Sequence, residues 1–187
     1  MVRLQEQYNT NVIPALREEF GYPNPMAVPR LIKIVISMGI GDGHADQAKL
    51  DSAAKQLGLI AGQRPVVMLA RKSISNFKLR EGMKVGLKVT LRRERMYEFL
   101  DRLVSLAIPR VKDFRGLNPS GFDGRGNYNM GLVEQTVFPE IDPASVTFNQ
   151  GMNIAFQTSA RTDEEGLELL RLLGMPFRGV DRDRGDR

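Results

Sequence analysis

Apolar residues recur along this chain with two periods, and each period predicts one type of element. Strict alternation places apolar side chains on one face of an extended strand. It is found over 30–38, 84–92 and 152–158, and a shorter strand is predicted over 66–69. Apolar residues three to four apart predict amphipathic helices instead. These are expected over 3–20, 45–61, 93–108 and 163–173.

The order of these elements predicts an α+β fold, with one mostly antiparallel sheet and helices packed on one face. The clearest alternation, over 84–92, puts Lys84, Gly86, Lys88, Thr90 and Arg92 on the face away from the helices. The strand over 30–38 contributes Lys33 and Ser37 to the same side, and the two strands are expected to be neighbours. A basic face that carries hydroxyls suits contacts to RNA phosphates and 2′-hydroxyls. The alternative is an ordinary solvated face.

The 187 residues are expected to form one α+β RNA-binding domain over 1–177, followed by a charged tail over 178–187. The tail alternates Arg, Asp and Gly and is expected to be disordered. Residues 110–150 are rich in Gly, Pro and Asn and have only short apolar runs, so we interpret them as a long excursion from the domain.

Charge is distributed unevenly along the chain. The overall net charge is +5, but residues 64–115 alone carry 14 basic and 5 acidic groups, whereas residues 116–187 carry 7 basic and 11 acidic groups. The basic third is expected to attract a polyanion. A protein-interaction adaptor whose basic face meets an acidic partner is an alternative to RNA binding.

The composition excludes several kinds of chemistry. There is no cysteine and only one histidine, His44, which excludes a disulfide framework, a Cys-based zinc site and a site with two histidine ligands. No membrane span or secretory signal is apparent, so a soluble cytoplasmic protein is expected. No cofactor, metal site or catalytic residue is predicted.

The glycine run 39–43 lies between a strand and a helix, as a dinucleotide-binding loop would. Its spacing fails, because His44 stands where the third glycine should be. We interpret the run as a tight turn that needs positive φ. A small nucleotide-dependent enzyme remains the alternative.

Two loops combine polar, glycine and aromatic residues. The loop 71–82 carries four of the basic groups counted above, together with Phe77. It is expected either to order on a structured RNA or to be a mobile hairpin with Phe77 tucked beneath it. The cluster 122–129 is interpreted as a turn that anchors the excursion.

Several stretches together resemble the bacterial form of the large-subunit ribosomal protein five family. They occur in the family's order and span about residues 3–178. The matching stretches are Val28-Pro29-Arg30, Met38-Gly39-Ile40-Gly41, Ala70–Arg80, Val89-Thr90-Leu91-Arg92, Asp113-Phe114-Arg115-Gly116, Phe122–Asn129, Phe138-Pro139-Glu140-Ile141 and Thr162-Asp163-Glu164-Glu165.

The resemblance implies a non-enzymatic constituent of the large ribosomal subunit that attaches 5S rRNA to the central protuberance. Ser37, Gln63 and Thr90 match family positions that hold the RNA, and Lys33, Lys88 and Arg92 are added from the alternation above. The loop 72–82 is expected to contact peptidyl-site tRNA through six residues: Lys72, Ser75, Asn76, Phe77, Lys78 and Arg80.

The other expected partners are large-subunit rRNA, neighbouring 5S-associated proteins and small-subunit protein thirteen, which would be bridged by residues 110–145. The chain departs from the family at Ser37, where asparagine is usual. It also departs at 148–153, which lacks the usual arginine and aspartate.

Overall fold

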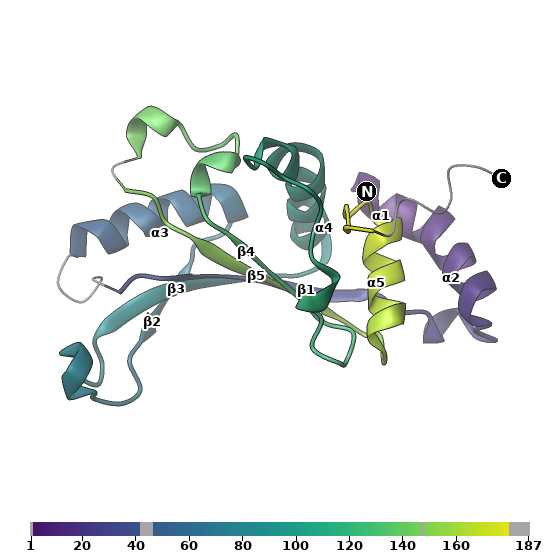
Figure 1. The fold of residues 1–187 in the computed structure, drawn as a ribbon, viewed down its shortest axis with the longest axis horizontal. Coiled ribbons are helices and arrows are strands. Elements are labelled where there is room, and N and C mark those ends of the chain that lie inside the picture. Colours follow the sequence, from purple (N-terminus) through teal and green to yellow (C-terminus); the bar gives the residue numbers. More distant parts are fainter. Residues whose placement is uncertain (1, 42–46, 147, 180–187) are drawn as a thin grey trace. The chain divides into compact units, whose positions relative to one another are not determined.

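The computed structural model describes residues 2–41, 47–146 and 148–179. They form five strands in one antiparallel sheet, together with helices, so the predicted α+β class is confirmed (Figure 1). The strand order is β2-β3-β1-β5-β4. The strands are β1 (Leu31–Gly39), β2 (Val66–Leu69), β3 (Lys84–Leu91), β4 (Tyr128–Leu132) and β5 (Met152–Thr158). As predicted, β1 and β3 are neighbours.

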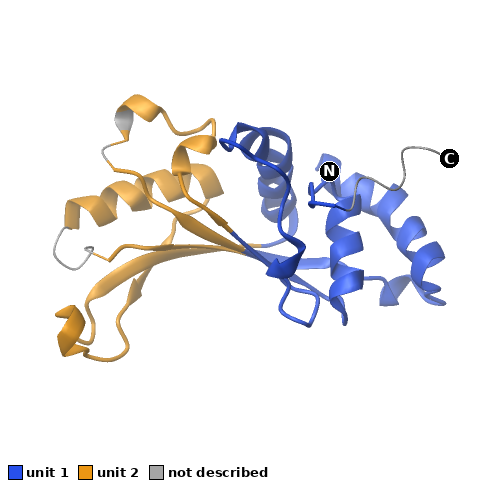
Figure 2. Cartoon of the chain, in the orientation of Figure 1, with its two compact units in different colours: residues 1–34, 92–130, 155–187 blue, residues 35–91, 131–154 orange. Residues whose placement is uncertain are grey.

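The chain divides into two compact units (Figure 2). The first unit comprises residues 1–34, 92–130 and 155–187, and the second comprises 35–91 and 131–154. Strands β1, β4 and β5 each contribute residues to both units. The excursion predicted over 110–150 contains β4, a strand that the apolar pattern does not reveal. Its sequence, Tyr-Asn-Met-Gly-Leu, includes two residues that are rare in strands.

In the first unit the N-terminal helix is interrupted. Helix α1 (Arg3–Gln7) continues into a π-helical turn over Tyr8–Val12 and then into α2 (Ile13–Phe20). The change falls beside Pro14, which has no N–H to donate to an α-helical bond, so the kink expected there takes the form of a wider turn. Helix α1 packs on α4 (Arg93–Arg102), and α2 packs on α5 (Asp163–Leu172).

Helix α5 begins after Thr162, which caps it. Thr162 Oγ1 accepts a hydrogen bond from Glu165 N at 3.4 Å. The Glu165 carboxylate reaches one residue further back than a standard capping box and accepts from Arg161 N at 2.8 Å. The three acidic residues of the first turn complement the positive end of the helix dipole.

In the second unit, α3 (Gln47–Ala61) lies along one face of the sheet and packs on β3 (Figure 1). Leu87 and Val89 of β3 and Leu57 of α3 are each at most 2% exposed, which identifies the apolar face of the strand as the covered face. The predicted helix over 45–61 is confirmed from Gln47 onward.

The predicted positive φ is wrong for Gly39 and Gly41 of the glycine run. The rest of that run lies among residues 42–46, outside the described residues, and so does His44. The same applies to most of the tail, from residue 180 onward.

Candidate RNA-binding surfaces

The second unit holds four of the six predicted rRNA-binding residues. Ser37 lies on β1 and Lys88 and Thr90 lie on β3, on neighbouring strands and on the face away from α3. Ser37 and Thr90 are half-buried and Lys88 is exposed. Gln63, half-buried, follows the end of α3. Within the described part of the chain, the side chains of Ser37, Lys88 and Thr90 make no hydrogen bond or ion pair to another residue.

A register shift makes the regular alternation on β3 begin later in the strand than the sequence suggests. Antiparallel pairing matches Val66 with Lys88 and Met68 with Gly86, but then shifts so that Leu69 faces Lys84. The prediction is therefore wrong for Lys84, which donates through Nζ to Gln47 Oε1 of α3 at 2.7 Å. The open face keeps Lys88 and Thr90.

Gly86 lies in the same irregular part of β3, and any residue with a side chain at this position would force the neighbouring backbone to move. A Cβ there would lie 2.5 Å from the carbonyl oxygen of Met38. The close approach of the two backbones explains why a residue without a side chain interrupts an otherwise regular alternation.

The predicted tRNA-contacting loop forms a hairpin that connects β2 and β3. Ala70 N donates to Met83 O at 2.8 Å, and Ile74 and Leu79 exchange two backbone hydrogen bonds of 2.9 and 3.1 Å. A short 3₁₀ turn, Ser75–Phe77, forms the tip and is followed by Lys78 in the left-handed conformation, with φ of 51°.

Side chains at this tip point outward. All six predicted contact residues are exposed, and Phe77 is 72% exposed, so the alternative in which Phe77 is tucked beneath the loop is wrong. An exposed aromatic ring on a hairpin that also carries three exposed cations, Lys72, Lys78 and Arg80, is suited to stacking on a nucleotide while the cations contact phosphates.

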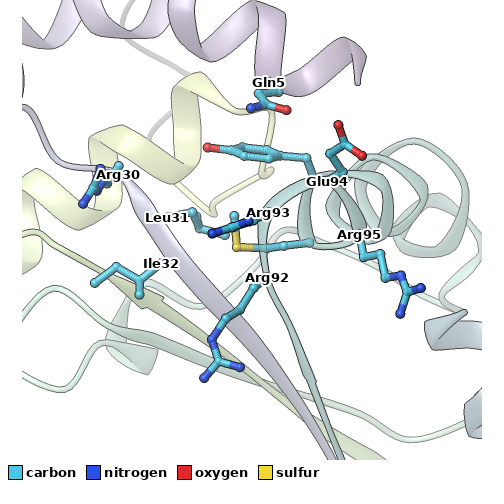
Figure 3. Close-up of a pocket in the computed structure, with 10 residues that line it drawn as sticks. Gln5, Arg30, Leu31, Ile32, Arg92, Arg93, Glu94 and Arg95 are labelled. Carbon is cyan, nitrogen blue, oxygen red and sulfur yellow. The ribbon is translucent and has the colours of Figure 1, made fainter. Parts of the chain in front are cut away.

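The first unit holds the other two predicted residues, Lys33 and Arg92. Lys33 is half-buried on β1. Arg92 is exposed and lines an open groove of about 1040 Å³ beside the start of α4 (Figure 3). Arg30 and Arg93 line the same groove and are not among the predicted site residues. The sequence signal that could have identified Arg93 is the basic run Arg92-Arg93-Glu94-Arg95. It was interpreted instead as the start of an amphipathic helix.

The cluster 122–129, also in the first unit, is a closed turn, as predicted. The Asp123 carboxylate accepts hydrogen bonds from the backbone N–H groups of Arg125 and Asn127, at 2.9 and 3.1 Å, and from Asn127 Nδ2 at 2.8 Å. These bonds, chiefly that from the Asn127 side chain, lower the pKa of Asp123. Asp163 accepts from Gly124 N and Gly126 N at 3.1 and 2.9 Å, which ties the turn to α5.

Neither a cluster of metal-ligating side chains nor a membrane-spanning helix occurs among the described residues. They bring no group of three His, Cys, Asp or Glu side chains together where a metal ion could be held. Among the helices they form, none has both the length and the apolar character that a bilayer crossing requires.

Comparison with known proteins gives matches over most of the chain. The family described as "Ribosomal protein L5" matches residues 24–80, and the model that describes the C-terminus of the same ribosomal family matches residues 84–177. The large ribosomal subunit protein uL5 of Rubrobacter xylanophilus is 59% identical over 178 residues, which cover 95% of this chain and 99% of the relative. This chain belongs to the uL5 family of ribosomal proteins.

Two further uL5 proteins show the same extent of similarity. That of Thermosipho africanus is 58% identical over 177 residues, covering 95% of this chain and 98% of the relative. That of Alkaliphilus oremlandii is 55% identical over 177 residues, covering 95% and 99%. As a uL5 protein, the chain is a structural, non-enzymatic constituent of the large ribosomal subunit, and rRNA and ribosomal proteins are its partners.

Proposed function

We propose that this uL5 protein binds 5S rRNA through the open sheet face of its second unit and so attaches the RNA to the central protuberance. The observation that carries the proposal is the pair of half-buried hydroxyls on Ser37 and Thr90, which have no side-chain partner within the described residues and lie on neighbouring strands. Hydroxyls so placed suit RNA 2′-hydroxyls and phosphate oxygens. Lys88 adds an exposed cation to the same face.

The absence of exposed aromatic side chains among these face residues favours backbone recognition over base stacking. Their placement explains how a serine can stand where the family usually has asparagine, because the shorter side chain remains half-exposed and a water molecule can bridge it to RNA. Gln63, at the end of α3, and Lys33 and Arg92 of the first unit complete the proposed rRNA contacts.

A gel-shift titration of the full chain with 5S rRNA, at several salt concentrations, tests the proposal. We expect a complex that survives competition by both tRNA and heparin. Equal displacement by heparin would show a generic polyanion surface, as the adaptor alternative requires, and would contradict specific 5S rRNA binding.

The substitution Thr90→Val tests the face at one atom. It keeps the shape of the side chain and removes the hydroxyl, so we expect 5S rRNA binding to weaken by about 1–3 kcal/mol, because an RNA partner is left unpaired. Thr90→Ser keeps the hydroxyl and serves as the matched control with near-normal affinity. Unchanged affinity in Thr90→Val would remove this residue from the contact surface.

The substitution Lys88→Ala tests the cation on the same face. It is expected to reduce the slope of log affinity against log salt by about one.

We also propose that the hairpin 72–82 contacts peptidyl-site tRNA. Support comes from the exposed ring of Phe77 and the exposed cations on the same hairpin, whose backbone is closed by hydrogen bonds.

The remaining proposed contact is a bridge from residues 110–145 to small-subunit protein thirteen. Site-specific crosslinking from Val133, which is 84% exposed, is expected to capture that protein in assembled ribosomes.

A further inference from the structure

The groove beside the start of α4 has a composition unlike that of the open face described above. It lies wholly within the first unit and is lined by Gln5, by residues 30–32 and by residues 92–97 (Figure 3). Its volume of about 1040 Å³ is at the upper end for small-molecule cavities and is suited to a segment of a polymer. Its described lining includes four arginines and one carboxylate, Glu94.

Three of these arginines have no counter-charge in the described part of the chain. Arg30, Arg92 and Arg93 are exposed and, among the residues that the structure describes, their guanidinium groups form no ion pair or hydrogen bond. Elsewhere in the same unit arginines do find carboxylates, as in the pairs Arg3–Asp101 and Arg171–Glu168. The three groove arginines therefore keep their planar, five-donor groups available for an anionic ligand.

Backbone hydrogen bonds fix the position of Arg30, and the phenols near it are uncharged. Its backbone exchanges hydrogen bonds with Ser159, with N donating to Ser159 Oγ at 2.9 Å and O accepting from Ser159 N at 2.9 Å. Two phenols lie near Arg30, those of Tyr8 and Tyr97. Burial raises the pKa of Tyr8 to about 12 and also raises the pKa of Tyr97. Both phenols stay neutral at physiological pH and leave the positive charge uncompensated.

Arg93 occupies a backbone conformation that an L-residue enters at a cost. Its φ is 53°, in the left-handed region, where glycine is favoured because it has no Cβ. Such outliers persist where the surrounding structure determines them, and they gather at functional sites. A glycine would fit the backbone here with less strain, so what the arginine adds is its side chain, which extends into the groove (Figure 3).

We propose that this groove binds the phosphodiester backbone of ribosomal RNA through Arg30, Arg92 and Arg93, as a contact separate from the hydroxyl-bearing face of the second unit. Guanidinium forks match phosphate oxygens, and the partly exposed Ile32 gives the ribose an apolar surface. The inference rests on the proposed RNA-binding function, which already includes Arg92, and it adds Arg30 and Arg93 as a second site around that residue. 5S rRNA and large-subunit rRNA present the same backbone chemistry, so both are probes.

The test measures binding of the full chain to 5S rRNA and, separately, to large-subunit rRNA, with the variants Arg92→Ala, Arg30→Ala and Arg93→Gly. Each loss of one phosphate contact is expected to weaken binding about four- to six-fold at 0.15 M salt and to lower the salt slope by about 0.7–0.9. The RNA for which this loss appears is the ligand of the groove. Arg178→Ala removes an exposed arginine of the same unit outside the groove and is expected to leave affinity near normal.

Arg93→Gly separates a binding role from a structural one, because the two roles predict opposite changes. Relief of the left-handed strain is expected to raise Tm by about 2–4 °C while RNA binding weakens. A lower Tm would assign Arg93 a structural role, and groove variants that match Arg178→Ala on both RNAs would overturn the proposal. If the unmodified chain binds neither RNA, the proposed function itself fails.

Discussion

The hairpin 70–83 and the turn 122–128 are both rich in polar and glycine residues, but they use their polar side chains differently. In the turn, the carboxylates of Asp123 and Asp163 accept hydrogen bonds from backbone N–H groups, so these polar groups are used within the protein. In the hairpin, backbone pairs between Ile74 and Leu79 close the loop, and most side chains stay in solvent. The turn therefore uses its carboxylates within the protein. The hairpin leaves most of its side chains available to a partner, although Ser73 Oγ accepts a hydrogen bond from Glu81 N at 3.0 Å.

The largest effect is expected where the turn meets α5. Gly166 is a helical residue, so replacement by alanine would normally stabilise the helix, but a Cβ there would lie 2.6 Å from Gly126 O and 3.0 Å from Gly126 Cα. We expect Gly166→Ala to lower the free energy of unfolding by about 2–3 kcal/mol, because neither backbone can move freely. Thermal or urea unfolding measures it.

The matched control is the same substitution in α3. A Cβ at Gly58 would have Pro65 Cδ as its nearest neighbour, at an ordinary 3.8 Å. Gly58→Ala is expected to stabilise the protein by about 0.5–1 kcal/mol. Equal effects of the two substitutions would show that the turn does not depend on close contact with α5.

A smaller effect, on binding instead of stability, is expected at the hairpin tip. Phe77→Ser removes an exposed ring, so the free energy of unfolding should change by less than about 0.5 kcal/mol. Affinity of the assembled large subunit for peptidyl-site tRNA should fall by about 1–2 kcal/mol, through loss of stacking. Leu59→Ser, at a residue of α3 that is 60% exposed, is the control, and an equal loss there would argue against a contact by Phe77.

The smallest effect is a pH dependence in the turn. Hydrogen bonds from Asn127 and nearby backbone hold the pKa of Asp123 below 3.8 in the folded state. A lowered carboxyl pKa contributes stability that is present above the ordinary pKa and lost as pH falls through the folded value. Urea unfolding of the unmodified chain and of Asp123→Asn should differ by a constant amount above about pH 5, and the difference should shrink on further acidification. A difference that persists at low pH would assign the role of Asp123 to something other than its charge.

Periodicity predicts this fold well wherever one face of an element is buried. The alternation over 84–92 and 152–158 identified β3 and β5 and their covered faces, because burial on one side of a sheet imposes a period of two. Strand β4 was not predicted, because its asparagine and glycine disfavour a strand locally. Its extended conformation depends on pairing with β5 instead. Lys84 was misplaced because a register shift depends on the partner strand.

The candidate sites were predictable in residue type more than in geometry. The alternation correctly placed Lys88 and Thr90 on the open face of β3, and the 72% exposure of Phe77 settled an alternative that composition leaves open. The arginine groove needed the structure, because Arg30 and Arg93 lie far apart in the sequence and φ at Arg93 leaves no trace in the pattern of apolar residues.

The register shift beside β2 also affects the tendency of the protein to self-associate before it binds RNA. Strand β2 is an edge of the sheet, and Val66 and Leu69 on it are 64% and 53% exposed. A long, regular apolar edge would be a template on which a second chain could add a strand. This edge spans only Val66–Leu69, and its pairing becomes irregular between Met68 and Leu69. Shortness and irregularity limit self-association of newly made protein, and they do so without placing a charge on this strand.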